Sequence, residues 1–207
     1  MSKPIVISLG EILWDMLPTG KRAGGAPVNF AYHASQNGAK SFAISAVGND
    51  ELGTELLSDA HKAGINTLVQ TNEYPTGTVD VALTNGIPEY TIVENVAWDH
   101  IKLTDELVEA VSKAVCFGTL GLRSPESHDT IVELLKHTKE GALKFFDINL
   151  RANFYSNELI EELLGYANIF KINDEELIMM RDMFSIPECN DEEACKWFID
   201  RFDLEYI

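Results

Sequence analysis

Short apolar runs rich in β-branched residues alternate along this chain with longer segments of helical character. Residues 5–10 and 41–47 predict two buried strands. A helix over 27–37 ends at Gly38, and a second helix, running to about residue 63, ends at Gly64. Glycine closes helices in this way because it readily adopts the left-handed conformation. Strand–helix units with capped ends predict an α/β fold.

The alternation becomes strict from Thr104 onward. Ser124 and Pro125 predict the N-cap and first position of a helix, and Ser156 predicts another N-cap. The predicted helices cover 104–113, 125–138, 156–167, 174–184 and 191–202, and the predicted strands cover 114–117, 143–146, 169–172 and 204–207. Strands that alternate with helices predict a mostly parallel sheet with helices on both faces, an αβα sandwich.

The middle of the chain predicts a different arrangement. Residues 79–84 and 87–93 form two β-rich runs on either side of Asn85-Gly86, a strong signal for a two-residue hairpin turn. Pro88 predicts that the second strand lies at a sheet edge, because proline has no backbone N–H to donate. Residues 12–16 predict a strand that leaves the main sheet, with Asp15 at its far end, to join this hairpin. A small projecting sheet of this kind is typical of a lid, and an ordinary edge hairpin explains it nearly as well.

The composition is that of a globular protein and disfavours several kinds of partner. Of the 207 residues, 45% are hydrophobic, which is enough for a full core, and the formal net charge is −17. So acidic a surface repels phosphate backbones, and no nucleic-acid partner is expected. The N-terminal Met-Ser-Lys-Pro lacks a signal peptide's apolar region and no apolar run approaches about 18 residues, so we expect no membrane association and a cytoplasmic location. Three cysteines without CxxC spacing support neither a disulfide framework nor a zinc site.

Residues 23–31 place two glycines directly before a predicted helix. Pro27 suits the first turn of that helix, and Asn29 follows it in the same turn. A glycine turn that leads into a helix N-terminus presents free N–H groups and one amide to a polar ligand. A tight loop with an asparagine facing water explains these nine residues equally well.

Three later strands are followed by polar segments: residues 118–119, 147–151 and 171–176. In open α/β sheets ligands bind beyond the carboxyl ends of the strands. Asn173 and Glu176 form an amide–carboxylate pair that suits a hydrated Mg²⁺ ion, whereas Arg151 and Lys171 suit anionic or polyol groups. Each has a structural alternative: Asn173 as an N-cap, Arg151 as a surface cation and Glu176 as a partner of the helix dipole.

Five motifs are spread over the whole chain: Gly-Glu-Ile-Leu-Trp-Asp at 10–15, Gly-Gly-Ala-Pro-Val-Asn-Phe-Ala at 24–31, Phe-Gly-Thr-Leu at 117–120, Phe-Asp-Ile-Asn-Leu-Arg at 146–151 and Asn-Asp-Glu-Glu at 173–176. Together they resemble the motifs of the ribokinase-like (PfkB) family of sugar kinases, especially its bacterial fructokinase branch. The resemblance implies a ribokinase-like sandwich with a β-sheet lid. It also implies ATP-dependent phosphorylation of a sugar hydroxyl with Mg²⁺, and it leaves a monovalent cation open.

By the same resemblance, residues on two sides of the site have distinct roles. The residues expected to bind the sugar are Asp15, Gly24, Gly25, Asn29, Tyr90, Trp98 and Arg151, with Tyr90 and Trp98 closing over it. The residues expected on the nucleotide-phosphate side are Lys171, Asn173 and Glu176, the last two reaching Mg²⁺ through water. The resemblance also implies a homodimer formed through the lid.

The catalytic base of this family is an aspartate in a glycine-rich G-A-G-D-type motif, and the 207 residues contain no such motif. We therefore expect residues 1–207 to be the N-terminal part of a single ribokinase-like domain, with lid segments at about 11–22 and 76–98. The catalytic aspartate and the ATP-binding portion would lie beyond Ile207. Since phosphoryl transfer needs a base to take the hydroxyl proton, negligible turnover is expected from these residues alone.

The substrate implied by the resemblance is fructose, and ribose or 2-keto-3-deoxygluconate are alternatives. A protein of the same fold that binds sugar without catalysis, or acts in regulation, is a further alternative. A nucleotide-cofactor oxidoreductase is disfavoured, because no G-x-G-x-x-G follows the first predicted strand.

Overall fold

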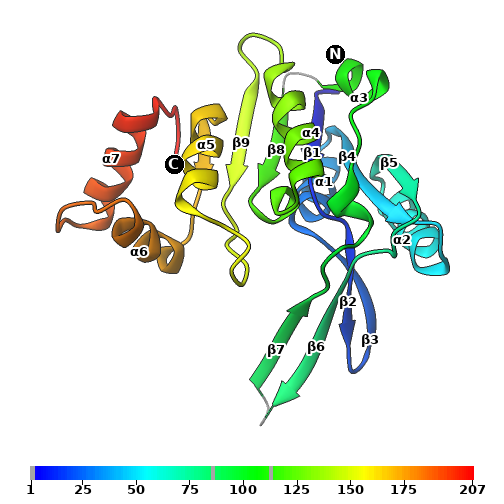
Figure 1. Ribbon diagram of the computed structural model, residues 1–207. Coiled ribbons are helices and arrows are strands. Elements are labelled where there is room, and N and C mark those ends of the chain that lie inside the picture. Colours follow the sequence, from blue (N-terminus) through cyan, green and yellow to red (C-terminus); the bar gives the residue numbers. More distant parts are fainter. Residues whose placement is uncertain (1–2, 85–86, 112–113) are drawn as a thin grey trace.

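The computed structural model of the protein describes residues 3–84, 87–111 and 114–207, which form a large sheet covered by helices and a small sheet that projects from it (Figure 1). Within these residues the large sheet has six strands, and every pairing in it is parallel. Their order across the sheet is β10 (Ile169–Lys171), β9 (Leu143–Asp147), β8 (Ala114–Gly118), β1 (Ile5–Leu9), β4 (Lys40–Gly48) and β5 (Asn66–Asn72). The chain thus builds outward from β1 first in one direction and then in the other. The predicted α/β sandwich is confirmed.

Helices cover both faces of the large sheet. They are α1 (Ala26–Gln36), α2 (Glu51–Lys62), α3 (Asp105–Ala110), α4 (Pro125–Lys136), α5 (Asn157–Tyr166), α6 (Asp174–Met183) and α7 (Asp191–Phe202), with 3-10 helices η1 (Ala97–His100) and η2 (Leu120–Leu122). Neighbouring residues of β4 face opposite sides. Ala43 packs in an apolar cluster with Val28 of α1 and Leu56 of α2, whereas Ile44 packs in a second cluster with Ile131 of α4.

Four phenylalanines connect the later strands on the α4 side of the sheet. Phe117, Phe146 and Phe170 come from β8, β9 and β10, and their ring centroids lie 5.4 and 5.5 Å apart in near-parallel stacks. Phe198 of α7 meets the Phe170 ring edge-on at 5.6 Å. All four rings are buried, and aromatic pairs of this geometry add about 0.5–1.5 kcal/mol each beyond their area burial. The polar ends of these strands are therefore held by a rigid aromatic layer.

The helix caps predicted from the sequence are present. The Ser124 and Ser156 hydroxyls accept hydrogen bonds from the N–H groups of Ser127 and Leu159, at the starts of α4 and α5. The helix predicted over 104–113 is shorter than expected and ends at Ala110, and residues 112–113 lie outside the described part of the chain. The strand predicted over 204–207 is reduced to a single bridge between Ile169 and Tyr206.

The small sheet has the strand order β3 (Gly20–Gly24), β2 (Leu13–Leu17), β6 (Thr78–Thr84) and β7 (Ile87–Ile92) and points away from the helices (Figure 1). β6 and β7 are antiparallel, and the predicted Asn85-Gly86 turn between them lies outside the described residues. β7 is an edge strand, as Pro88 predicts, and β2 joins the hairpin by pairing with β6. Asp15 lies in the middle of β2, opposite Arg22, and not at its far end.

The structure contains two strands that the sequence did not predict. β5 is the edge strand of the large sheet, and five of its seven residues are asparagine, glutamine or threonine, so it shows no apolar pattern. β3 reads Gly-Lys-Arg-Ala-Gly, which has weak strand propensity, and its pairing with β2 makes it a strand. Among the described residues no helix is long and apolar enough to cross a membrane.

A buried arginine joins the base of the small sheet to the body. Arg123 donates from Nε and Nη2 to the Asp99 carboxylate at 2.8 and 2.7 Å, and Nη2 also donates to the Val93 carbonyl just after β7 at 2.6 Å. Its guanidinium lies 3.9 Å from the centroid of the Trp98 ring and 4.7 Å from that of Phe154. The Arg123 and Asp99 side chains are only 4% and 5% exposed. We call Arg123, Asp99, Trp98 and Phe154 the arginine junction.

Replacing Arg123 by methionine is expected to destabilise the protein by about 3–5 kcal/mol, because the Asp99 carboxylate then stays buried without its cation. The free energy of unfolding in urea, followed by circular dichroism, measures the loss. Lys62→Met is the control, since its ion pair with Asp59 is 73% and 46% exposed. That variant is expected to lose less than about 1 kcal/mol. Equal losses in the two variants would contradict a stabilising role for the arginine junction.

Candidate functional site

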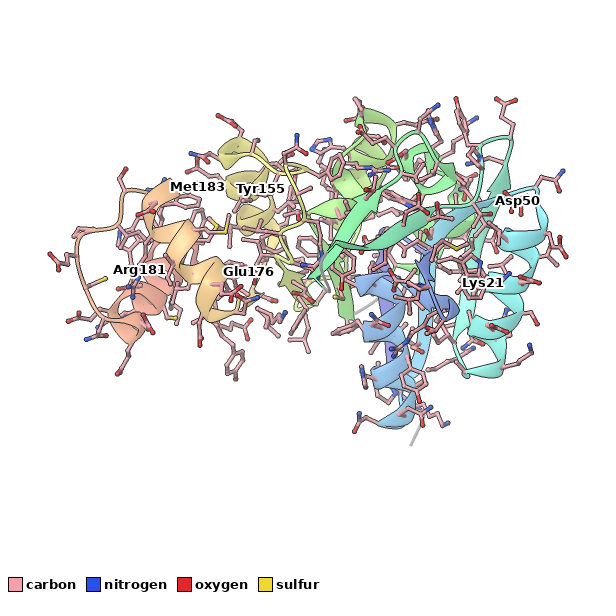
Figure 2. All side chains as sticks on the ribbon, turned by 90° about the horizontal axis from the view of Figure 1, so that it is seen from below. Lys21, Asp50, Tyr155, Glu176, Arg181 and Met183 are labelled. Carbon is pink, nitrogen blue, oxygen red and sulfur yellow. The ribbon has the colours of Figure 1, made fainter. Side chains whose placement is uncertain are left out.

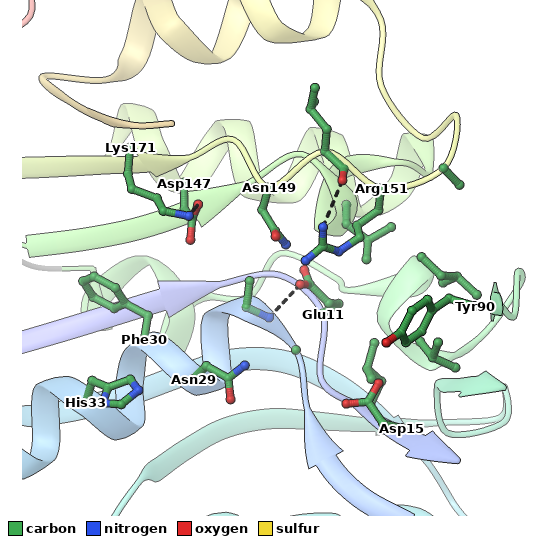
Figure 3. A pocket seen from close by; sticks show the side chains of 18 of the residues that line it. Glu11, Asp15, Asn29, Phe30, His33, Tyr90, Asp147, Asn149, Arg151 and Lys171 are labelled. Atoms are coloured by element: carbon green, nitrogen blue, oxygen red, sulfur yellow. Dashed lines mark hydrogen bonds and ion pairs between the residues drawn. The ribbon is translucent and has the colours of Figure 1, made fainter. Parts of the chain in front are cut away.

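A cavity of about 950 Å³ lies between the small sheet, the N-terminus of α1 and the carboxyl ends of β9 and β10 (Figure 3). Its polar lining residues are Glu11, Asp15, Asn29, His33, Tyr90, Asp147, Asn149, Arg151 and Lys171. They come from five separate stretches of the chain, and the fold brings them to one edge of the large sheet. This is the edge at which ligands bind in open α/β sheets, close to the strand from which the chain order reverses.

The two glycines before α1 allow the helix to start directly against the strand segment after β1. Gly25 has φ of 110°, and a Cβ at this position would overlap the Glu11 carbonyl oxygen. A Cβ at Gly24 would lie 2.7 Å from the Asp15 Oδ2 atom. Gly25 is the N-cap of α1 and supplies no side chain, so the Glu11 carboxyl group accepts the first helix N–H, that of Ala26, in its place. The predicted glycine turn into a helix is confirmed as a structural element.

Asp15 and Asn29 lie along one wall of the cavity, and Arg151 lies on the opposite wall (Figure 3). Burial raises the pKa of the Asp15 carboxyl, and the positive charges of Arg22 and Arg151 oppose this shift. Arg151 Nη1 donates to the Leu150 carbonyl at 3.1 Å. The wall therefore presents a carboxylate and an amide opposite a guanidinium, a set that can accept from and donate to neighbouring hydroxyl groups.

Glu11 is a cavity residue that the sequence analysis did not identify. Its side chain is 3% exposed, and its Oε1 atom accepts a hydrogen bond from the Ala26 N–H at 2.9 Å. Burial raises the pKa of the Glu11 carboxyl to about 7, while Arg151 opposes the shift and Asp147 adds to it. The signal in the sequence was a glutamate directly after the glycine that ends the first buried strand, where an acidic residue has no structural purpose of its own.

Lys171 and Asp147 form an ion pair at the ends of the neighbouring strands β10 and β9. The distance from Lys171 Nζ to Asp147 Oδ1 is 3.0 Å, with the lysine side chain 47% exposed. Both residues line the cavity, on the side away from the small sheet (Figure 3). The lysine therefore places a cation at the far end of the cavity from Tyr90.

Asn173 and Glu176 form the N-terminal capping box of α6, outside the cavity wall. Asn173 Oδ1 accepts from the Glu176 N–H at 2.9 Å, and Glu176 Oε2 accepts from the Asn173 N–H at 3.0 Å. Glu176 Oε1 accepts from the Leu150 N–H at 3.0 Å, which ties α6 to the loop that carries Arg151. Figure 2 shows Glu176 between Arg181 and the part of the molecule that carries Lys21 and Asp50. The alternative in which Asn173 is an N-cap is confirmed.

Both Glu176 oxygens already accept backbone hydrogen bonds, so the residues present fit a metal ion only through bridging water. In the described part of the chain no group of three or more His, Cys, Asp or Glu side chains is placed to hold a metal ion directly. This geometry agrees with the water-mediated Mg²⁺ contact expected from the sequence but supplies no inner coordination sphere.

Trp98 and Tyr90 occupy different positions, although the sequence analysis assigned them the same role. Tyr90 of β7 is 64% exposed and lines the cavity. Trp98, a member of the arginine junction, is 1% exposed and also packs with Val96 and Leu120. In this structure Trp98 does not line the cavity, because its buried ring packs against the Arg123 guanidinium; the prediction that it closes over a sugar stays untested.

Comparison with known proteins gives a family match over most of the chain. The model for the pfkB family carbohydrate kinases matches residues 16–199. Among similar proteins, the uncharacterised sugar kinase PH1459 of Pyrococcus horikoshii is 30% identical over 200 residues. Fructokinase-1 of Zea mays is 27% identical over 210 residues. These alignments cover 86% and 90% of this chain but 64% and 65% of the relatives. The chain thus spans a little under two thirds of their length.

Solved structures show the same fold. The crystal structure of PH1459 in complex with ATP matches with a TM-score of 0.75 at 28% identity, covering 86% of this chain and 66% of that chain. The apo structure of a fructokinase from Vibrio cholerae O395 matches with a TM-score of 0.81 at 23% identity, covering 98% of this chain and 73% of that chain.

Gly25→Ala is expected to lower the free energy of unfolding more than Gly20→Ala. Both glycines have positive φ, 110° and 125°, so each alanine is strained by about 1–3 kcal/mol. Nothing lies within 4 Å of a Cβ at Gly20, whereas at Gly25 the methyl group meets the Glu11 carbonyl oxygen. That overlap is expected to add about 1–3 kcal/mol to the loss of the free energy of unfolding in Gly25→Ala, which urea denaturation measures. Equal losses would show that the turn is not packed against Glu11 in solution.

Proposed function

The chain belongs to the pfkB family of carbohydrate kinases, and from that membership we propose that the protein phosphorylates a hydroxyl group of a sugar with ATP, fructose being the favoured substrate. The observation that carries this proposal is the pairing of Asp15 and Asn29 with Arg151 across one cavity. A hexose has several hydroxyl groups, each of which donates one hydrogen bond and accepts others, and the two walls supply both kinds of partner.

The charges of the cavity favour a neutral sugar over a sugar acid. Three carboxyl groups line it, those of Glu11, Asp15 and Asp147, and two cationic side chains, those of Arg151 and Lys171. Lys171 is paired with Asp147, which leaves Arg151 facing the two other carboxyl groups. An anionic 2-keto-3-deoxygluconate would add a further negative charge here, so fructose or ribose fits this set of charges better.

In this proposal each wall of the site has its own task. The Asp15 carboxylate and the Asn29 amide orient the sugar from the α1 side, and Arg151 donates to its oxygens from the opposite side. Tyr90 covers the sugar from the small sheet, which acts as a lid. Holding the reacting hydroxyl in one orientation is a large part of catalysis in phosphoryl transfer, because the chemistry depends mainly on positioning and charge neutralisation.

The nucleotide side of the proposal uses Lys171, with Asn173 and Glu176 beyond it. Support for ATP comes from the related PH1459, whose crystal structure is a complex with ATP. Lys171 would neutralise phosphate charge, and Asn173 and Glu176 would orient water molecules of a Mg²⁺ ion. When bound, Mg²⁺ supplies charge neutralisation at the phosphates. Three further features stay predictions: a monovalent cation, a homodimer formed through the small sheet and a cytoplasmic location.

A non-catalytic sugar-binding or regulatory role is the second candidate. Its support is that the residues proposed to bind the sugar line one cavity, an arrangement that binding alone would also use. Since the 207 residues contain no G-A-G-D-type motif, we propose that these residues alone bind sugar but turn it over negligibly.

Asp15→Ala and Asn29→Ala are each expected to weaken fructose binding by about 1–3 kcal/mol, because each removes a hydrogen-bonding partner of the sugar hydroxyl groups. Isothermal titration calorimetry measures the change. Asp80→Ala is the matched control, since Asp80 is an exposed aspartate of the adjacent strand β6 that does not line the cavity. Unchanged affinity in both site variants would refute the assignment of this wall to the sugar.

A coupled ADP-release assay tests the reaction itself. The protein encoded by the complete gene is assayed with ATP and Mg²⁺ on fructose, ribose, 2-keto-3-deoxygluconate and adenosine, with the 207-residue chain in parallel. We expect the highest kcat/KM with fructose and negligible turnover by the 207-residue chain. Absence of activity with every substrate, together with retained fructose binding, would favour the non-catalytic role.

A further inference from the structure

Glu11 is the one acidic group among the described cavity residues that is almost fully buried; it contacts the start of α1 and lies within the electrostatic influence of Arg151 on the opposite wall. It directly follows Gly10 at the end of β1, the central strand from which the chain order reverses. Its side chain is 3% exposed although it carries a carboxyl group. A buried carboxyl group is costly unless it has partners, so its contacts indicate what it does.

Both the main chain and the side chain of Glu11 hold the start of α1. The Glu11 carbonyl oxygen lies so close to Gly25 that a Cβ there would overlap it. The Glu11 carboxyl group accepts the Ala26 N–H, the first orphan donor of the helix. Asn29 is placed by this same helix turn, since its N–H donates to the Gly25 carbonyl at 3.0 Å. The geometry of the Asn29 wall therefore depends on Glu11.

The charged and titratable groups that face Glu11 come from the opposite side of the cavity. Arg151, on the loop after β9, attracts the carboxylate, and Asp147 at the end of β9 repels it. Cys116 of β8 lies within electrostatic reach of both acids, and burial raises the pKa of its thiol well above the ordinary value, so it stays neutral. Gly121 of η2 packs against the Glu11 N–H without a titratable side chain. Figure 3 shows Glu11 below the Arg151 guanidinium.

We propose that Glu11 is a proton-dependent positioning residue that holds the N-terminus of α1 and Arg151 in register across the sugar cavity. This inference rests on the proposed sugar-binding function and extends it to the control of that site by pH. Ionised Glu11 accepts a stronger hydrogen bond from the Ala26 N–H than protonated Glu11 does, because the negative carboxylate is attracted to the N–H dipole and to the positive N-terminal end of the helix dipole. It also attracts Arg151. Protonated Glu11 keeps the hydrogen bond but loses the attraction to Arg151.

The proton equilibrium of Glu11 falls in the range where such a change matters. Burial raises the pKa of the carboxyl to about 7 from an ordinary value of 4.5. Because the folded state favours the protonated form, Glu11 contributes stability at low pH that is lost as the pH rises from about 5 to 7. Above pH 7 the ionised carboxylate attracts Arg151. As the pH rises, the contribution of Glu11 to the free energy of unfolding therefore falls, whereas its attraction to Arg151 grows.

The first test needs no sugar. The NMR shift of the Ala26 amide proton reports the ionisation of its acceptor and is expected to titrate with a midpoint of about 7. Glu11→Gln keeps an acceptor of the same shape without the charge, and its Ala26 signal is expected to be independent of pH between 5 and 9. His33→Gln is the control, because it removes the histidine that lines the same cavity and leaves Glu11 in place. It is expected to keep the Ala26 titration. A flat Ala26 signal in the unsubstituted protein would overturn the inference.

The second test measures fructose affinity by calorimetry between pH 5.5 and 8.5. Affinity is expected to rise about two- to fivefold through neutral pH, the size of effect given by a charge at a helix N-terminus. In Glu11→Gln it is expected to stay at the low-pH value throughout. The same pH profile in both proteins would overturn the inference even if the variant is less stable. No fructose binding at any pH, with a normal Ala26 titration, would instead reject fructose as the ligand while supporting proton-dependent control of the helix start.

Discussion

The close contact between the Gly25 backbone and the segment that follows β1 is the constraint on which the rest of the site depends. It brings the N-terminus of α1 to the central strand of the large sheet, and Asn29, Asp15 and the Glu11 carboxyl group take their positions from it. A side chain at position 25 would separate the helix from the strand. The sheet supplies the opposite wall independently, through the ends of β9 and β10 and the stacked phenylalanines beneath them.

Much of the fold could be predicted because several local signals agreed. Apolar runs, the Ser124 and Ser156 caps and the glycines after helices each indicated the same α/β order, and the structure has that order. β3 and β5 were missed because their strand character comes from pairing with neighbours, not from their own residues. The edge position of β5 also removes the apolar alternation that would have marked it.

The site could be predicted only in part, and the gaps have a common physical cause. Sequence motifs identified which residues gather at the cavity but not which way each side chain turns. Trp98 follows the β7 strand that carries Tyr90, yet the buried Arg123–Asp99 pair holds its ring in the core. Glu176 was expected to reach Mg²⁺ through water, and the motif gave no sign that its two oxygens also accept the backbone N–H groups of Leu150 and Asn173. Glu11 was overlooked because burial, and not sequence, gives its carboxyl group an unusual proton affinity.

The arginine junction has a consequence for how this chain can change during evolution. Arg123 contacts the end of β7, the Asp99 carboxylate, the Trp98 ring and Phe154 of the loop that also carries Arg151. Loss of the arginine leaves a buried charge, and loss of the aspartate leaves another, so either change alone passes through an unstable intermediate. These four positions are therefore expected to be replaced together or not at all. The end of β7 and the loop that carries Arg151 then share one evolutionary history, even though they come from distant parts of the chain.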